Sequence, residues 1–74
     1  MLARLSNEMT ESELKKSVRE RIIKARTDGV PTGRIIKFAD DGISYQVIYG
    51  MIGAVPIPIE LWKKMDQVLR KMGY

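Results

Sequence analysis

The groups best suited to chemistry in the middle of the chain are two adjacent carboxylates, Asp40 and Asp41, and the tyrosines that follow them. Two carboxylates directly before a glycine are, however, typical of a turn. The chain contains no histidine and no cysteine, so it lacks the usual proton shuttle and the usual thiol nucleophile. We therefore expect a protein that is not an enzyme, and we expect no cofactor and no metal site.

The chain has a net charge of +4, and its basic residues are concentrated in two parts of the sequence. Six of them lie between residues 15 and 26, where Glu20 is the only acid, and four lie between residues 63 and 71. From Gly42 to Ile59 there is no charged residue. Basic flanks around an uncharged centre could contact phosphate groups. Two solvated helix faces explain the same pattern, and charge alone favours that simpler interpretation.

A chain of 74 residues is expected to form one domain. We expect it to span residues 10–74, after a flexible N-terminus at residues 1–9 that shows no apolar period. A domain of this size buries little core and has no cysteine to form a disulfide, so association with a second copy would add core. The sequence therefore predicts a homodimer.

The uncharged stretch from Gly42 to Ile59 is nearly long enough to cross a membrane, but Pro56 and Pro58 interrupt it. The first residues also lack the apolar run of a signal peptide. We expect a cytoplasmic protein with no membrane contact.

Two outer segments have the apolar spacing of amphipathic helices. Thr10 and Glu13 form a capping-box pattern before apolar residues at three- and four-residue steps, which predicts a helix over about 11–27 that ends at Gly29. A second helix is predicted after Pro58, with Gly73 at its end. It carries a wide apolar stripe, which we expect to provide the dimer interface through Trp62, Met65, Leu69 and Met72.

Residues 30–57 permit two structures. In the first, Asp41-Gly42 forms the tight turn of a β-hairpin that pairs Phe38 with Tyr45. The result is an α+β fold, helix–β-hairpin–helix, whose function would be that of an oligomerising or partner-binding module. Local strand propensity favours this structure slightly.

In the second structure, the same residues form two short helices. Thr32 caps a helix over Gly33–Asp40, Gly42 makes the turn, and Ser44 caps a helix over Tyr45–Ile52. The fold class is then all-α, a compact four-helix domain with a central helix-turn-helix. Such a crossed pair is the arrangement that places a helix in the major groove of DNA.

A resemblance decides for the second structure. The segments GISYQVIYGMIG (residues 42–53) and PIPIELWKKMDQVLRKMG (residues 56–73) resemble the lambda-repressor/Cro-like (Xre-type) helix-turn-helix DNA-binding family, as does the earlier RERIIKARTDG. In that family, a glycine–apolar–serine turn precedes a recognition helix, and a loop near a proline leads to a closing helix. Where the family has a small residue before the turn, this chain has Phe38, with Ala39 one place later.

The resemblance implies a small transcription regulator, such as a compact repressor of a phage or mobile element, that binds double-stranded DNA as a dimer. It makes Ser44, Tyr45, Gln46 and Tyr49 the candidate groove residues, and Thr32, Arg34 and Lys37 the candidate phosphate contacts. Gln46 suits an adenine edge, because its amide can both donate and accept a hydrogen bond. Phosphate contacts would set the register without reading the sequence.

Overall fold

The structure is a computed structural model, and it describes residues 10–39, 42–53 and 55–74. In chain order, its elements are α1 (Glu11–Thr27), α2 (Thr32–Phe38), α3 (Tyr45–Ile52) and α4 (Ile59–Lys71). No strand occurs in these ranges. The predicted all-α four-helix domain is therefore confirmed, and the helix–β-hairpin–helix alternative is wrong. The expected flexible segment at residues 1–9 and the Asp40-Asp41 pair lie outside the described residues.

Local capping explains where α1 and α3 begin. The Thr10 hydroxyl accepts a hydrogen bond from the Glu13 N–H at 3.1 Å, and the Glu13 carboxylate accepts one from the Thr10 N–H at 3.0 Å. Ser44 caps α3 by accepting the N–H of Val47 at 3.3 Å. These contacts satisfy backbone donors that have no partner inside the helix. Both helices have the bounds that the sequence predicts.

Helix α2 differs from its predicted bounds. Its N-cap is Pro31, whose extended backbone (φ −72°, ψ 153°) leads into the helix without a side-chain cap, and the helix ends at Phe38. Thr32 is not the cap because its side chain lies on the inner side of α2, together with that of Ile35 three residues later. The buried small residue that follows the helix is Ala39, while Phe38 is exposed.

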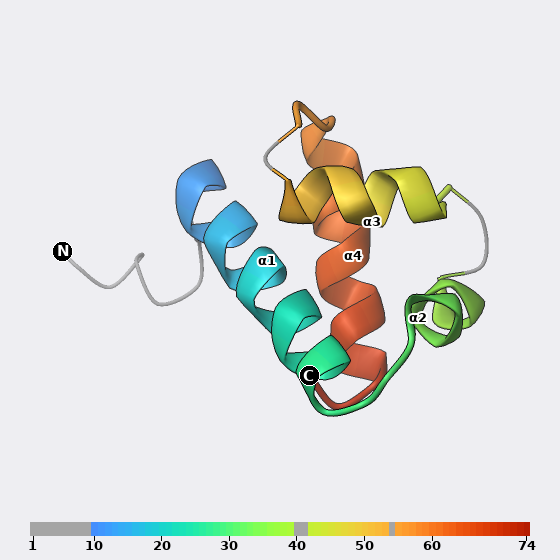
Figure 1. Ribbon diagram of the computed structural model, residues 1–74. Helices are drawn as coiled ribbons and strands as arrows, with labels where there is room; N and C mark the ends of the chain where they lie inside the picture. Colours follow the sequence, from blue (N-terminus) through green and yellow to red (C-terminus); the bar gives the residue numbers. More distant parts are fainter. Residues whose placement is uncertain (1–9, 40–41, 54) are drawn as a thin grey trace, which may run out of the picture.

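The four helices cross one another around a shared interior. Helix α1 packs against α4 and α3, and α2 packs against α3 and α4. In Figure 1, α3 lies across α4 in the plane of the view, whereas α2 is seen end-on, so α2 and α3 are crossed. Gly42, between them, has a φ of +90°, a backbone conformation that glycine adopts readily.

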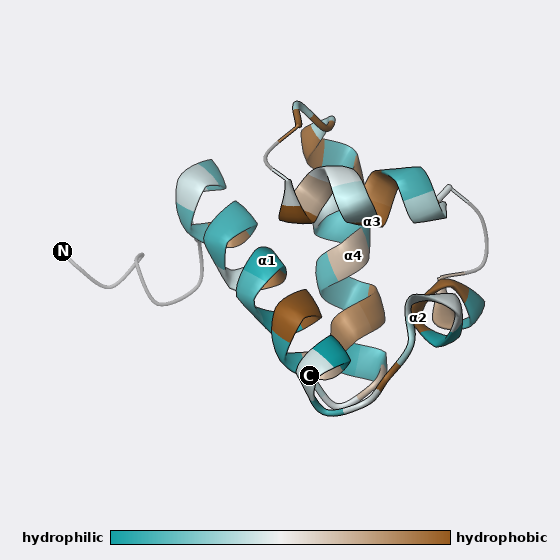
Figure 2. Cartoon of the chain, in the orientation of Figure 1, coloured by the Kyte–Doolittle hydropathy of each residue, from teal (hydrophilic) through white to brown (hydrophobic). Residues whose placement is uncertain are grey.

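Every helix contributes to the core. Hydrophobic and hydrophilic residues alternate along α1 and α4 (Figure 2), as expected for helices that bury one side. Among the described residues, twelve hydrophobic side chains are buried: Val18, Ile22, Ala25, Ile35, Ala39, Ile43, Ile48, Met51, Trp62, Met65, Val68 and Leu69. The core is therefore closed by α1, α2 and α3 on the apolar side of α4.

This packing corrects the expected dimer interface. Trp62, Met65 and Leu69 are buried within the single chain, and only Met72 of the expected set is partly exposed. The stripe on α4 is wide because α1 and α2 pack against it and buried α3 side chains share the same core, not because a second copy covers it. These three side chains therefore offer no surface to a partner.

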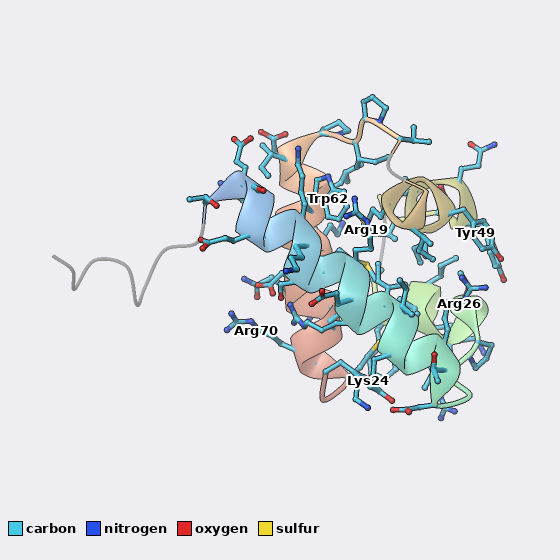
Figure 3. All side chains as sticks on the ribbon, turned by 60° about the vertical axis from the view of Figure 1, so that its left-hand side comes forward. Arg19, Lys24, Arg26, Tyr49, Trp62 and Arg70 are labelled. Atoms are coloured by element: carbon cyan, nitrogen blue, oxygen red, sulfur yellow. The ribbon has the colours of Figure 1, made fainter. Side chains whose placement is uncertain are left out.

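Two arginines of α1 form hydrogen bonds with residues of α3, of α4 and of the C-terminal end of the chain. Arg21 donates to the Asp66 carboxylate at 2.6 Å and to the Tyr74 carbonyl at 2.8 Å. Arg19 donates to the Met51 carbonyl at 2.9 Å, and its guanidinium lies 5.8 Å from the centre of the Trp62 ring, as Figure 3 shows. Because both heads are partly buried, these charge-assisted bonds hold α1 against the ends of α3 and α4 more firmly than exposed ion pairs would.

The last residue, Tyr74, also bonds to the C-terminal end of α1, and the stability that this bond provides depends on pH. The Tyr74 hydroxyl donates to the Asp28 carboxylate at 2.8 Å. This hydrogen bond, followed by burial and by the charge of Asp28, raises the pKa of Tyr74 above its ordinary value of 10.0. The stability that the bond provides is thus fully present below the pKa of the unfolded chain, and it is lost as the pH rises through the higher folded pKa.

We expect the free energy of unfolding of the wild type to exceed that of Tyr74→Phe by a constant amount from pH 7 to 9, and the difference to shrink above about pH 10. The phenylalanine variant keeps the ring and removes only the titrating hydroxyl. Chemical denaturation of both proteins across this range measures the difference. A difference that stays constant up to about pH 11 would rule out the proposed linkage.

Candidate nucleic-acid interface

The outer face of α3 presents polar aromatic groups to solvent. Ile48 and Met51 face the core, which turns the opposite side of this short helix outward. On that side Tyr45 is 53% exposed, Tyr49 is 50% exposed, and Gln46 is also exposed. The structure thus brings together three of the four groove residues that the resemblance implies.

The two tyrosines form an ordered pair. Their ring centres are 6.3 Å apart with an angle of 27° between the rings, as expected for residues one helical turn apart. The Arg26 guanidinium, from the end of α1, lies 5.6 Å from the centre of the Tyr49 ring (Figure 3). Arg26 therefore extends the α3 surface with a positive charge. Nothing in the sequence distinguishes Arg26 from the other basic residues of its helix, because this contact joins distant segments.

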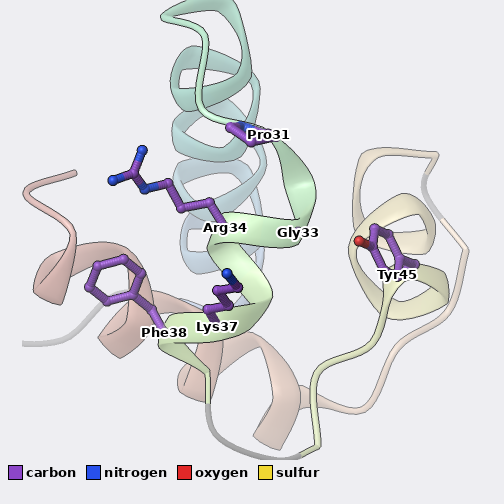
Figure 4. A pocket seen from close by; sticks show the side chains of 6 residues that line it. All are labelled: Pro31, Gly33, Arg34, Lys37, Phe38 and Tyr45. Atoms are coloured by element: carbon purple, nitrogen blue, oxygen red, sulfur yellow. The ribbon is translucent and has the colours of Figure 1, made fainter.

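Helix α2 borders the same surface. Arg34 and Lys37 are exposed on it, as expected of phosphate contacts. With Pro31, Gly33, Phe38 and Tyr45 they line an open depression of about 580 Å³ between α2 and α3 (Figure 4). The depression combines two cations with two aromatic rings, a combination suited to an anionic partner with apolar parts.

Two of the expected contact residues have other roles. The Ser44 side chain accepts the N–H of Val47, although a hydroxyl that accepts one hydrogen bond can still donate its proton. Thr32 is only 7% exposed, so its side chain is not part of the outer surface. The expected phosphate contact of the Thr32 side chain is therefore corrected: the helix turns it inward.

The electrostatics of this surface favour an anion. Helices α2 and α3 contain no acidic residue, Arg26 lies over the Tyr49 ring, and Arg34 and Lys37 line a depression with Tyr45. The acidic residue nearest to Arg26 along the chain is Asp28. Its carboxylate already forms an ion pair with Lys24 at 3.7 Å and accepts a hydrogen bond from the Tyr74 hydroxyl. The surface can therefore supply hydrogen bonds, aromatic contacts and positive charge to one partner.

Two other kinds of feature are absent from the described parts of the chain. No group of three or more acidic side chains gathers there that could hold a metal ion. None of the helices described has both the length and the apolar character needed to cross a membrane.

Comparison of the chain with models of protein families, with curated proteins and with solved structures finds no match. The functional inference therefore depends on the geometry of α2 and α3 and on the sequence resemblance.

Proposed function

We propose that the protein is a small sequence-specific regulator that binds double-stranded DNA as a dimer and acts by occupying its site. The observation that carries this proposal is the exposed face of α3, which presents Gln46 beside the stacked rings of Tyr45 and Tyr49. Cations from two other helices lie near these rings: Arg26 of α1 is over Tyr49, and Arg34 and Lys37 of α2 line a depression with Tyr45. A compact cytoplasmic repressor of a phage or mobile element, of the lambda-repressor/Cro-like kind, would have this size and this arrangement.

The proposal assigns α3 to the major groove, which is wide enough to admit an α-helix. Gln46 would hydrogen-bond the edge of an adenine, and Tyr45 and Tyr49 would contact thymine methyl groups or phosphates. Because α3 carries no charge, its contribution would depend on the base sequence more than on salt.

Arg34, Lys37 and Arg26 would supply the part of the affinity that does not depend on sequence. Each cation that neutralises a phosphate releases counterions, which makes binding weaker as salt is added. Arg34 and Lys37 line a depression with Tyr45 and Arg26 lies over Tyr49, so these cations would hold the helix in register with the groove.

We expect Arg34→Ala to weaken binding to every duplex alike and to reduce the slope of log affinity against log salt by about 1. A suitable control is Lys16→Ala, which removes the same charge from the N-terminal half of α1, on the opposite side of the molecule from α2 in Figure 1. Fluorescence anisotropy with labelled duplexes at several salt concentrations measures both slopes. Equal slopes for the two variants would contradict the assignment of Arg34.

The dimer is expected to use a surface other than the buried stripe on α4. Large hydrophobic side chains that are exposed in the single chain include Ile23, Phe38 and Val55. Sedimentation at micromolar concentration should show a species of twice the 8.5 kDa chain mass. A two-fold dimer would then bind two half-sites about one helical turn apart. A wild type that stays monomeric at high concentration, both alone and on DNA, would overturn this part of the proposal.

A further inference from the structure

Tyr45 lies close to the first turn of α2. In Figure 4 its ring projects from α3 toward Gly33. A Cβ atom placed on Gly33 would be 2.8 Å from the Tyr45 hydroxyl oxygen, and the next atom, Tyr45 Cζ, would be 3.9 Å away. The hydroxyl therefore occupies space that is open only because residue 33 has no side chain.

Backbone conformation does not explain a glycine at this position. Gly33 lies inside α2 and is not among the glycines with a positive φ, so an L-amino acid could adopt its backbone angles. Glycine also weakens a helix relative to alanine. The close approach of the Tyr45 hydroxyl is the feature of the structure that requires the missing Cβ.

We infer that Gly33 is a positioning residue that sets where Tyr45 lies on the α3 surface, and that it thereby affects which DNA sequence is preferred. With Gly33, the Tyr45 ring can lie against the first turn of α2, in the depression that Arg34 and Lys37 also line. With any larger residue, a Cβ atom 2.8 Å from that hydroxyl would force the half-exposed ring to shift away from the first turn of α2. The effect on DNA rests on the proposed function, whereas the effect on the ring does not.

The test compares four proteins: the wild type, Gly33→Ala, Tyr45→Phe and the double variant. Because only the hydroxyl oxygen is too close, Tyr45→Phe should relieve the clash that Gly33→Ala creates. In the double variant the phenylalanine ring should return to α2. The measurements are the thermal unfolding midpoint, the NMR contacts between ring 45 and residue 33, and the affinity for a duplex selected from a random pool and for a scrambled one.

We expect Gly33→Ala to unfold at the same temperature as the wild type or higher, because alanine favours the helix and the displaced ring is half-exposed. The ring contacts should be lost. Affinity for the selected duplex should fall by about threefold to tenfold, the equivalent of one hydrogen bond, with no change for the scrambled duplex. On the Tyr45→Phe background, Gly33→Ala should change neither the ring contacts nor the affinity.

Unchanged ring contacts in Gly33→Ala would overturn the inference, and so would displaced contacts with unchanged affinity for the selected duplex. A wild type that binds no duplex would instead overturn the proposed function and, with it, the effect on sequence preference. The ring measurements would then decide the positioning role by themselves.

Discussion

Leu69→Lys should leave the protein unfolded or largely unfolded. Leu69 is completely buried where α4 meets the other helices, so a lysine there would have its ammonium group in an apolar interior without a partner. The penalty is about 4 kcal/mol or more, which is comparable with the whole stability of a domain of this size. Far-ultraviolet circular dichroism and the dispersion of amide resonances measure the loss of structure.

The matched control for this variant is Gln67→Lys. Gln67 lies two residues earlier on the same helix but is exposed, so the same lysine should change the free energy of unfolding by less than about 0.5 kcal/mol. A well-folded Leu69→Lys protein would show that α4 does not pack as described. That result would instead support the interpretation of the apolar stripe on α4 as a surface between chains.

Gln46→Ala should weaken binding to the preferred duplex by about 1–3 kcal/mol, or roughly 5- to 150-fold, while binding to unrelated duplexes stays the same. The reason is that Gln46 is the exposed group on α3 best able to pair with a base edge, whereas the neighbouring cations contact phosphates. Anisotropy titrations with the selected and the scrambled duplex separate the two contributions.

The other glutamine of the chain provides the control for this prediction. Gln67→Ala removes an equally exposed amide from α4, outside the proposed interface, and should leave both affinities unchanged. An equal loss for every duplex would assign Gln46 a role in positioning rather than in sequence recognition. No loss for any duplex would remove it from the interface.

The parts of the fold that the sequence predicts are those specified locally. The capping box at Thr10 and the serine cap before Tyr45 satisfy backbone donors within a few residues, so the bounds of α1 and α3 follow from short patterns. Gly29 and Gly42, with a positive φ, likewise mark the ends of segments. The choice between the hairpin and the helix pair depends on a longer stretch of sequence, because local strand propensity favours the hairpin and the longer resemblance favours the helices.

The errors share one physical cause, which is contact between segments that are distant in sequence. Threonine is a residue type that often caps helices, but packing turns the Thr32 side chain inward. The α4 stripe has the width of an interface between chains, but α1 and α2 pack against it and buried side chains of α3 share its core. A single helix pattern gives the width of an apolar face and does not identify what packs against it.

The same cause explains which candidate site residues were missed. Arg26 belongs to α1 and meets Tyr49 only after folding, and Gly33 meets Tyr45 only when α2 and α3 cross. The resemblance provides the candidate residues on α3 itself, and the fixed spacing around a helix places Tyr45, Gln46 and Tyr49 on its exposed side. The contacts that Arg26 of α1 and Gly33 of α2 make with these residues could not be identified from the sequence.

The central claim, that the α2–α3 surface binds DNA, is tested most directly by titrating isotope-labelled protein with the selected duplex and following the backbone amide resonances. We expect the largest changes at Arg26, at residues 33–38 and at residues 44–49, and little change at residues 63–71 of α4. The scrambled duplex should produce smaller changes that disappear as salt is added. The absence of changes with any duplex at low salt, or changes concentrated on α4, would contradict the claim.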